Sequence, residues 1–545
     1  MSDFAIRKNH PLGDLNRRAN LNFSRMDSQY YQPDFVREME TGYCWPGDWI
    51  GRAMLADTSL QRVTGRDSGY LEALFETAYS LRNARGYLGC VEVPGVFDEQ
   101  QFAGHSWLLR ALIQYYSQYG DSRALEMVQD IVYQLYLPAA GYIAQYPQSK
   151  EDRVYTGEKS GTLTGSVIDG WRISSDTGCA FISIDGLTDA YALLGDPQIA
   201  TLIERMTDVF MQINFTGIQM QTHASLTACR GIMRYYKSSG EIRYLRFVEE
   251  LFRTYADYGM TENYANYNWF CRPTWTEPCA IIDSYILAMD LFKTTAQTEY
   301  LQKAHRIYYN ALCFAQRFNG GFGCDLCVGP DKTVLTADTD SDPLCEAYWC
   351  CTMRGGEGLA SVIENAVLER EDALCLTQYF DLRYDNGQVR FKETTRFPQE
   401  GEVHLTLEVS DKPVRLDLYI PPYAEHPNVV TDGCAHKAEA ARGGFYSLIL
   451  PVGKHRVALT FGISLRCEPP VGKLVSQEKK IYWHGDLIVG LPVREAPPVE
   501  AVDFRREKEW YVDALTGRPA GHLMDNINSN IQKDTSFVQS LQIVF

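Results

Sequence analysis

The sequence lacks the features that mark membrane, secreted and nucleic-acid-binding proteins. It contains no run of about 18 uncharged apolar residues, the length that a membrane-spanning helix needs. No apolar stretch follows residues 1–4, so no secretory signal is indicated. Basic residues are few, because 52 Lys and Arg stand against 69 Asp and Glu, for a net charge of −17. We therefore expect a cytoplasmic protein that binds neither membranes nor nucleic acid, since nucleic-acid binding depends on Lys and Arg.

Cysteine, by contrast, is plentiful. The chain has 15 cysteines, an odd number, and in a cytoplasmic protein most of them should be reduced. Inert buried cysteines would be spread along the chain. Here seven fall between residues 271 and 351, and they are Cys271, Cys279, Cys324, Cys327, Cys345, Cys350 and Cys351. This crowding is the strongest chemical signal in the composition.

The first two thirds of the chain show apolar residues at helical spacing. Residues 121–137 form one such stretch, with Asp121 or Ser122 as N-cap and Pro138 as the stop. With weaker stretches before residue 65, about a dozen helices follow one another in pairs without strands between them. This pattern predicts an (α/α)6 toroid, and a helical solenoid is the alternative, although no fixed repeat is visible. The other expected helices span residues 70–84, 102–118, 184–194, 197–213, 222–238, 241–258, 278–294, 297–316 and 356–369.

After about residue 372 short alternating or β-branched segments replace the helices. We therefore expect a mainly α, then β architecture in three parts. Residues 1–371 would form the toroidal catalytic domain, residues 372–470 a β-sandwich domain, and residues 471–545 a C-terminal β segment. The expected strands span residues 403–409, 414–420, 446–450 and 456–461, with a strand pair in 481–491.

Two short motifs carry candidate metal ligands. Residues 276–279 (Thr-Glu-Pro-Cys) are typical of a helix start, with Thr276 as N-cap and proline in the first turn. The helix dipole there favours the thiolate form of Cys279. Further on, the adjacent pair Cys350 and Cys351 precedes another helix. Together with Glu277 these cysteines predict a zinc site of three thiolates and one carboxylate.

These motifs resemble those of the β-L-arabinofuranosidase family, glycoside hydrolase family 127, and its close relatives. That family carries Glu-x-Cys at a helix start, a later Cys-Cys pair, and an acid/base glutamate ahead of both, where Glu262 stands here. The sequence departs from the family after the Cys-Cys pair and at residues 98–101, so the mechanism transfers better than the substrate. Further matches are Gly86-Tyr87-Leu88, Gly104-His105, Thr222-His223-Ala224, Tyr309-Asn310-Ala311-Leu312 and the segment from His484 to Val489.

The resemblance implies a retaining exo-glycoside hydrolase. Cys350 would attack the anomeric carbon, and Glu262 would act as the acid/base. Zinc would be the cofactor, held by Glu277, Cys279, Cys350 and Cys351. The substrate would be an oligosaccharide or glycoconjugate that ends in β-L-arabinofuranose or a similar furanose. A homodimer made through the β-modules is a further implication of the family.

Several other residues are candidates for the sugar site. His105 and His223 match family positions that contact the sugar, although a lone helical histidine is more often a core residue. Tryptophans beside the chemical segments could stack on sugar rings or pack in the core. They are Trp269, Trp275 and Trp349. Glu346 competes with Glu262 for the acid role.

Two other classes of function remain open from sequence. A toroid enzyme with Asp/Glu chemistry could use Glu262 with Asp283 or His223 and leave the zinc structural. A non-catalytic carbohydrate-binding protein could use zinc only to join helices, and Cys324-x-x-Cys327 with Cys345 offers a rival structural site. The negative net charge disfavours an anionic polymer, although Arg272 and Arg354 could each hold one carboxylate.

Overall fold

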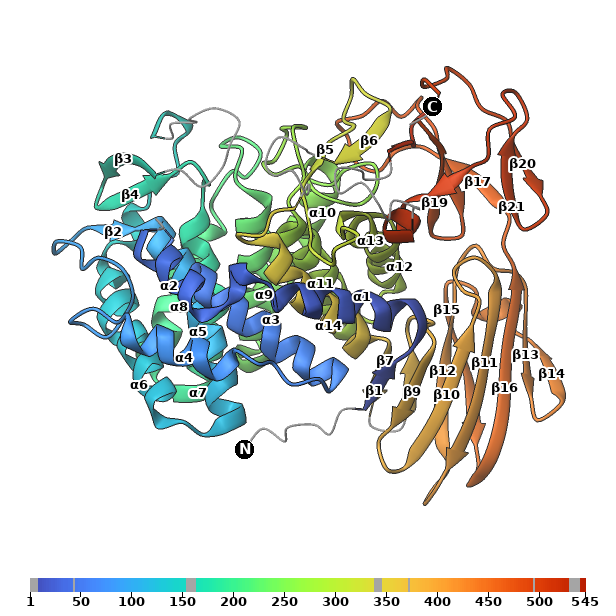
Figure 1. The fold of residues 1–545 in the computed structure, drawn as a ribbon, viewed down its shortest axis with the longest axis horizontal. Coiled ribbons are helices and arrows are strands. Elements are labelled where there is room, and N and C mark those ends of the chain that lie inside the picture. Colours follow the sequence, from blue (N-terminus) through green and yellow to red (C-terminus); the bar gives the residue numbers. More distant parts are fainter. Residues whose placement is uncertain are drawn as a thin grey trace.

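The fold is taken from a computed structural model. A helical body built from the N-terminal residues lies beside a β-rich C-terminal part (Figure 1). Cys345, one of the cysteines of the rival zinc site, lies outside the described residues. The structure describes residues 8–42, 45–152, 163–337, 346–370, 373–493, 496–528 and 540–545.

Within the described residues, six helices form a closed inner ring. Each packs against the next along the chain, and the last packs against the first. Closure excludes an open solenoid and confirms the predicted (α/α)6 toroid. The inner helices are α3 (Asp48–Thr64), α5 (Glu99–Tyr119), α7 (Ser183–Leu194), α9 (Thr222–Ser239), α11 (Pro278–Thr295) and α14 (Cys351–Asn365).

An outer layer of helices covers the ring. Outer and inner helices alternate along most of the chain, so the inner helices run parallel and their N-termini share one end of the toroid, its mouth. The short α2 (Pro33–Gly42) lies against α3 and α4. The outer helices are α1 (Gly13–Met26), α4 (Leu71–Ser80), α6 (Ser122–Asp130), α8 (Pro197–Phe210), α10 (Ile242–Tyr258) and α12 (Thr298–Ile307).

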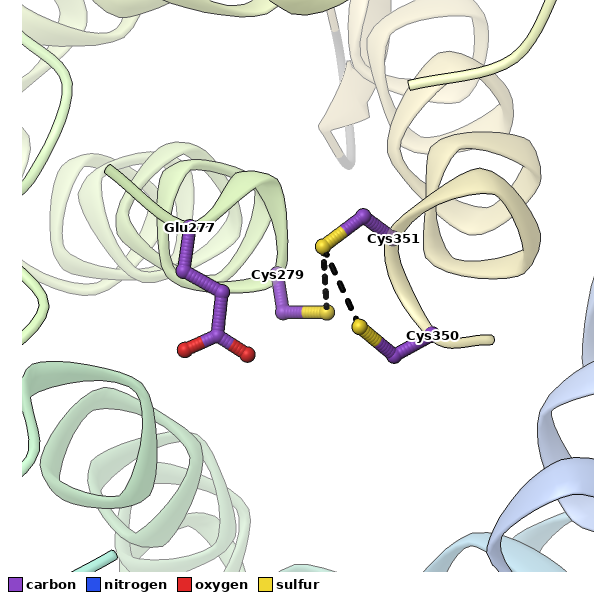
Figure 2. A group of neighbouring side chains, drawn as sticks. All are labelled: Glu277, Cys279, Cys350 and Cys351. Atoms are coloured by element: carbon purple, nitrogen blue, oxygen red, sulfur yellow. Dashed lines mark hydrogen bonds between the residues drawn. The ribbon is translucent and has the colours of Figure 1, made fainter. Parts of the chain in front are cut away.

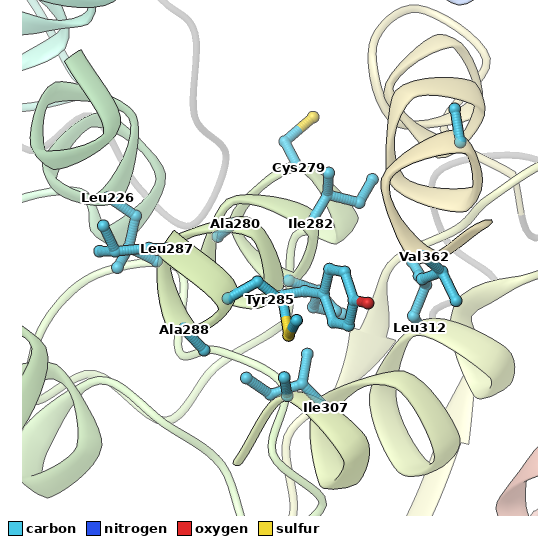
Figure 3. Close-up of a cluster of buried hydrophobic side chains, with 14 of the residues drawn as sticks. Leu226, Cys279, Ala280, Ile282, Tyr285, Leu287, Ala288, Ile307, Leu312 and Val362 are labelled. Atoms are coloured by element: carbon cyan, nitrogen blue, oxygen red, sulfur yellow. The ribbon is translucent and has the colours of Figure 1, made fainter. Parts of the chain in front are cut away.

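The inner helices are buried on nearly all sides and pack closely. Figure 3 shows side chains of α11 meeting Leu226 of α9 and Val362 of α14. A Cβ atom added to Gly231 of α9 would lie 2.7 Å from the backbone nitrogen of Asp185 in α7. Glycine costs helix propensity, and here it is needed for backbone contact between neighbouring inner helices. None of the helices in the described ranges is long and apolar enough to cross a membrane.

Helix α6 begins as the sequence predicts but ends differently. Asp121 caps it, accepting a 2.9 Å hydrogen bond from the Arg123 amide. Helix α6 then widens into a π-helical turn (Ile131–Tyr136), as α12 does at Tyr308–Leu312 before the short α13 (Cys313–Ala315).

The predicted N-cap of α11 is wrong. Glu277 occupies the N-cap position, and the Thr276 hydroxyl instead accepts from the Asp325 amide at 2.9 Å. Asp325 comes from a distant strand, so nothing in the local sequence indicates this bond. The exchange leaves the Glu277 carboxylate uncommitted to capping.

The β-sandwich consists of two sheets in the described residues. One has the order β1-β9-β10-β11-β16-β13-β14 and the other β15-β12-β8-β7. Residues of β11 are alternately buried and partly or fully exposed, as in a strand with one face on a core. The sandwich takes β1 from the chain's N-terminal part. Its strands are β1 (Asn9–Pro11), β7 (Val367–Arg370), β8 (Ala373–Leu376), β9 (Leu382–Asp385), β10 (Val389–Thr395), β11 (Gly401–Val409), β12 (Val414–Ile420), β13 (Glu425–Thr431), β14 (Cys434–Lys437), β15 (Gly444–Leu450) and β16 (Gly453–Gly462).

The C-terminal β segment was expected to begin at residue 471, but its sheet already includes β17, which begins at Leu465. The name therefore refers to residues 465–545 from here on, and this segment is joined to the toroid through a shared sheet. This sheet has the order β17-β18-β19-β23-β6-β5, with β22 paired to β19. Strands β5 and β6 belong to the toroid part of the chain and β23 to its C-terminus. The bounds are β5 (Asp325–Leu326), β6 (Val334–Ala337), β17 (Leu465–Glu468), β18 (Ile481–His484), β19 (Leu487–Pro492), β22 (Gly521–His522) and β23 (Leu541–Gln542). Two small sheets complete the fold, from β2 (Phe97–Asp98), β3 (Leu163–Ile168) and β4 (Trp171–Ser174), and from β20 (Phe504–Glu507) and β21 (Trp510–Asp513).

Candidate active site

The four predicted metal ligands converge at the mouth of the toroid, and we call them the carboxylate–thiol cluster (Figure 2). Glu277 is the N-cap residue of α11 and Cys279 lies in its first turn. Cys350 is the N-cap residue of α14 and Cys351 its first residue. The donor atoms of all four lie within 4.8 Å of one another. They meet because α11 and α14 are neighbouring inner helices with their N-termini at the same end.

The geometry and chemistry of this cluster fit a zinc ion. The Sγ atoms of Cys279 and Cys351 are 3.7 Å apart, and those of Cys350 and Cys351 are 3.3 Å apart. Tetrahedral zinc with Zn–S bonds of about 2.3 Å places its sulfur ligands about 3.8 Å apart. Three thiols and one carboxylate form a donor set that zinc accepts. Among the described residues this is the group of donors that could hold a metal ion.

The charges of the cluster are interdependent. Burial, reinforced by the nearby Cys279, raises the pKa of Glu277 well above its usual range. Burial alone would also raise the pKa of Cys279, but its interactions with the thiols of Cys350 and Cys351 and the charge of Arg52 lower the pKa well below the usual value. A hydrogen bond to Cys279 raises the pKa of Cys350. A cation bound among these four groups would favour the ionised form of each of them.

The three cysteines have different surroundings. The Arg52 guanidinium donates to Cys279 Sγ at 3.4 Å and is itself paired with Asp48 at 2.8 Å. Cys351 is buried, which raises the pKa of its thiol, and the neighbouring Cys279 and Cys324 raise that pKa further. Cys350 is half-buried and therefore the most accessible of the three. Arg52 and Asp48 were not predicted as site residues, although their spacing of four residues on one helix is typical of an ion pair.

His223 lies in the first turn of α9, and its ring is fixed from both sides. Its Nδ1 contacts the Asp283 carboxylate at 3.0 Å, and Trp107 stacks on the ring with centroids 5.8 Å apart. Its Nε2 is buried and has no hydrogen-bond partner among the described residues. An unpaired ring nitrogen at the mouth is available to a ligand.

Asp283 serves as a fixed anion and not as a proton donor. Arg230 and Arg354 each donate to its Oδ1 at 2.5 Å, and Thr227 donates to Oδ2 at 2.6 Å. Although burial opposes ionisation, the charges of Arg354 and Arg230 hold the pKa of Asp283 well below its usual range. Arg354 is also paired with Glu357, so its charge is shared between two carboxylates of the protein. Arg272 lies over the Trp269 ring, 4.3 Å from its centroid.

His105 is bonded entirely within the protein. Its Nε2 accepts from the Leu88 amide at 3.0 Å, and its Nδ1 contacts the Gln101 carbonyl at 2.8 Å. Burial lowers its pKa to about 4. These bonds tie the loop that follows α4 to helix α5, and they leave no ring nitrogen for a sugar.

Glu262 lies in the loop between α10 and α11, and 1% of its surface is exposed. Its carboxyl accepts from the Tyr267 hydroxyl at 2.8 Å and from the Gly329 amide at 3.4 Å. Burial raises its pKa above the usual range. A carboxyl that keeps its proton to higher pH suits a general acid. The same loop supplies Asn266, whose side chain accepts from the Glu277 amide at 2.9 Å, so the two parts of the site are linked.

Glu346 has a structural environment. It is fully buried and pairs with Arg25 at 2.9 Å. Asn319 and Thr352 donate to it at 2.8 and 2.7 Å. These bonds attach α1 to the beginning of α14 and hold an anion. This arrangement favours Glu262 as the acid.

The remaining predicted residues divide by exposure. Trp269 is 1% exposed and packs edge-to-face on Trp275 at 5.7 Å, so it offers no open face to a sugar. Trp349 is half-buried beside Tyr348.

Cys327, a cysteine of the rival zinc site, points at the Asn266 carbonyl, 3.9 Å away, and so faces a different neighbour from Cys324.

The comparisons with known proteins agree with this fold. No family model matches the chain, and no curated protein matches it in sequence. A solved structure described as a glycoside hydrolase matches with a TM-score of 0.68 at 11% identity, covering 99% of this chain and 96% of that one. A GH127 β-L-arabinofuranosidase from Geobacillus stearothermophilus T6 matches with a TM-score of 0.64 at 14% identity, over 97% and 93% of the two chains.

A second GH127 β-arabinofuranosidase matches with a TM-score of 0.65 at 12% identity, over 99% of this chain and 94% of the other. The chain shares the fold of GH127 β-L-arabinofuranosidases. The resemblance inferred from the motifs is thereby confirmed at the level of the fold. One fold supports many chemistries, so the activity must be argued from the site itself.

Proposed function

We propose that the protein is a retaining glycoside hydrolase with Cys350 as nucleophile and Glu262 as acid/base. The proposal includes a zinc ion held by Glu277, Cys279, Cys350 and Cys351. It is carried by the convergence of three thiols and one carboxylate within 4.8 Å at the mouth of a toroid. A toroid enzyme with Asp/Glu chemistry has no need of such a cluster.

The choice of Cys350 rests on accessibility and charge. Cys279 is held by Arg52 and Cys351 is buried in the first turn of α14, whereas Cys350 is half-buried. Bound zinc would keep the cysteines as thiolates at neutral pH, where a free thiol with a pKa near 8.5 is mostly protonated.

The reaction then follows the two steps of a retaining hydrolase. Cys350 Sγ bonds to the anomeric carbon as the glycosidic C–O bond breaks, and Glu262 gives its proton to the leaving oxygen. Glu262 next takes a proton from water, which displaces Cys350 and releases the sugar with its original anomeric configuration.

Uncharged polar groups around the start of α9 support a neutral sugar as substrate. Several polar side-chain atoms there are buried and have no hydrogen-bond partner in the described structure. They are His223 Nε2, Gln221 Oε1, and Asn268 Oδ1 and Nδ2. The Asn268 backbone carbonyl accepts from the Thr222 amide at 3.0 Å, next to His223. Such groups exchange hydrogen bonds with hydroxyls. With the GH127 fold, they support a terminal β-L-arabinofuranose or a similar furanose on an oligosaccharide or glycoconjugate.

The test joins stereochemistry with labelling. A panel of nitrophenyl glycosides followed by proton NMR should show hydrolysis with anomeric retention. A haloacetamide-type furanose analogue should label Cys350, and Cys350→Ser should lose turnover by about 10³-fold or more. Cys324→Ser is the matched control, since Cys324 borders the cluster and should tolerate the change. Inversion of configuration, or labelling mainly elsewhere, would reject the mechanism.

Metal analysis is the second arm of the test. The purified protein should hold about one zinc per chain, and the Cys279→Ser/Cys351→Ser double variant should hold much less. Active protein that is free of zinc would rule out the cluster as a zinc site.

A further inference from the structure

The turn that carries Glu262 is connected to the C-terminal β segment through helix α12 and the π-helical turn that follows it. Asn263 donates to the Asn310 carbonyl at 3.0 Å, and the Tyr264 hydroxyl accepts from Arg306 at 2.8 Å. Tyr264 has a φ of +64°, a left-handed conformation that a bulky residue adopts only when its surroundings hold it there. The turn is therefore fixed by its neighbours on α12 and the following π-helical turn.

Arg306 is the centre of this attachment. It is paired with Glu468 of β17 at 2.9 Å and with Asp486, in the β18–β19 turn, at 3.3 Å. Its guanidinium also lies over the ring of Trp483 from β18, 4.2 Å from the centroid. Trp483 in turn packs edge-to-face on Tyr264 at 5.7 Å. Arg306 thus clamps the Tyr264 side chain against three strands or turns of the C-terminal β segment.

Asn310 makes a second connection to the same hairpin. Its side chain donates to the Asp486 carbonyl at 2.7 Å and accepts from the Ile488 amide at 2.8 Å. Its own carbonyl holds Asn263. The residues on both sides of the β18–β19 turn therefore fix the residue that follows Glu262.

The loop between β5 and β6 contacts the Glu262 carboxyl, and this loop is also attached to the C-terminal β segment. Gly329, whose amide contacts the carboxyl, belongs to the loop between β5 and β6. Lys479 donates to the carbonyl of Pro330 in that loop at 2.5 Å, and the Thr333 carbonyl accepts from the Ile543 amide at 3.0 Å. Lys479 and Ile543, which make these two contacts with the β5–β6 loop, both belong to the C-terminal β segment.

We infer that the C-terminal β segment positions the Glu262 carboxyl, and that Arg306 and Tyr264 are positioning residues of the hydrolase. The inference rests on the proposed acid/base role of Glu262. Neither residue meets the substrate; both act by fixing the turn from which Glu262 delivers its proton. The C-terminal part of the chain is on this view a working part of the catalytic site.

The test removes one hydroxyl from this clamp. Tyr264→Phe deletes the acceptor of the Arg306 bond and leaves Arg306 paired with Glu468 and Asp486. The matched control is Tyr423→Phe, because the Tyr423 hydroxyl donates to Asp486 at 3.0 Å in the same cluster but does not contact the Glu262 turn. Both substitutions remove one buried hydroxyl with little change of shape.

The readout is the dependence on the leaving group. Tyr264→Phe should lower kcat/KM about tenfold or more on an alkyl glycoside, which needs the proton, and less than about threefold on a nitrophenyl glycoside. Tyr423→Phe should leave the ratio of the two substrates unchanged. Equal losses of Tyr264→Phe on both substrates, or the same ratio in both variants, would overturn the inference. So would a Tyr264→Phe protein whose activity falls only in step with its thermal stability.

Glu262→Gln, measured alongside, separates the two proposals. If Glu262→Gln fails to distinguish alkyl from nitrophenyl glycosides, the acid role fails and the inference falls with it. If Glu262→Gln distinguishes them and Tyr264→Phe does not, the acid role stands and the positioning role is wrong.

Discussion

Two buried glutamates near the site should respond in opposite ways when each is changed to glutamine. Glu346 is fully buried and faces Arg25, Asn319 and Thr352, all of which donate to it. Glutamine keeps the shape but loses the charge, and its amide would point a donor at other donors. Glu346→Gln should therefore weaken the attachment of α1 to α14 and leave the chemistry intact.

The expected loss follows from the buried ion pair. Removing one partner of a buried pair costs about 3–5 kcal/mol. The Arg25 side chain keeps 13% of its surface exposed, so the lower end, about 3 kcal/mol, applies. An unfolding entropy of about 2.1 cal/mol/K per residue gives about 1.1 kcal/mol/K for the whole chain, so Tm should fall by about 3 °C if the domains unfold together.

Glu262→Gln should have the opposite effect, since it should preserve the stability of the protein and remove its activity. Because burial raises the pKa of Glu262, the folded state disfavours its ionised form. This cost is fully present above the folded pKa and vanishes below the unfolded value of 4.5. Removing the ionisable group should therefore leave Tm equal or higher at pH 8, and the difference from the native protein should disappear near pH 4. Activity on alkyl glycosides should be abolished.

Thermal scans at one heating rate, at pH 8 and pH 4, check both variants, with kcat/KM on an alkyl and a nitrophenyl glycoside below the transition. Glu346→Gln should keep the native ratio between the two substrates. A stable Glu346→Gln protein that loses activity selectively on the alkyl glycoside would refute the assignment and make Glu346 the acid. A Glu262→Gln protein that is less stable at pH 8 than at pH 4, relative to the native protein, would refute the pKa argument.

Two further outcomes follow from single contacts. The Tyr267 hydroxyl donates a hydrogen bond that stabilises the Glu262 carboxylate, so Tyr267→Phe should raise the pKa of Glu262. The basic limb of the pH profile of kcat/KM should then move to higher pH, and a shift to lower pH would contradict this. Gly231→Ala should cost about 1–3 kcal/mol of stability, seen as a lower Tm, because its Cβ would meet the α7 backbone. At Gly240, at the exposed end of α9, an added Cβ meets no atom within 4 Å, so Gly240→Ala measures the strain of a positive φ without a steric clash.

The sequence predicted the toroid because the outer helices carry a clear apolar stripe and the inner helices are apolar on nearly all sides. It predicted the carboxylate–thiol cluster from the Glu-x-Cys and Cys-Cys motifs and the family resemblance that they carry. It could not predict contacts that ring closure creates. Arg354 and Asp283 lie on different inner helices, and nothing in their local sequence shows that they meet. The capping role given to Thr276 failed for the same reason, since its partner Asp325 comes from a distant strand.

The attachment of the C-terminal strands to the toroid was equally hidden. Strand β23 has two residues, and it gains its place by pairing between β19 and β6. A strand of two residues is too short to show an alternation of apolar and polar side chains, so only its pairing with other strands in the folded protein determines where it lies.

The proposed catalytic groups therefore depend on two different closures of the chain. The thiols of the carboxylate–thiol cluster meet because α14 completes the ring beside α11, at the ends of rigid inner helices. Glu262 lies instead on a loop, where a carboxyl would be poorly fixed by the toroid alone. The C-terminal β segment supports that loop indirectly, through Arg306 and Asn310 and through the β5–β6 loop. A retaining hydrolase needs its nucleophile and acid at a fixed separation, and here a ring of helices sets one position while a separate sheet sets the other.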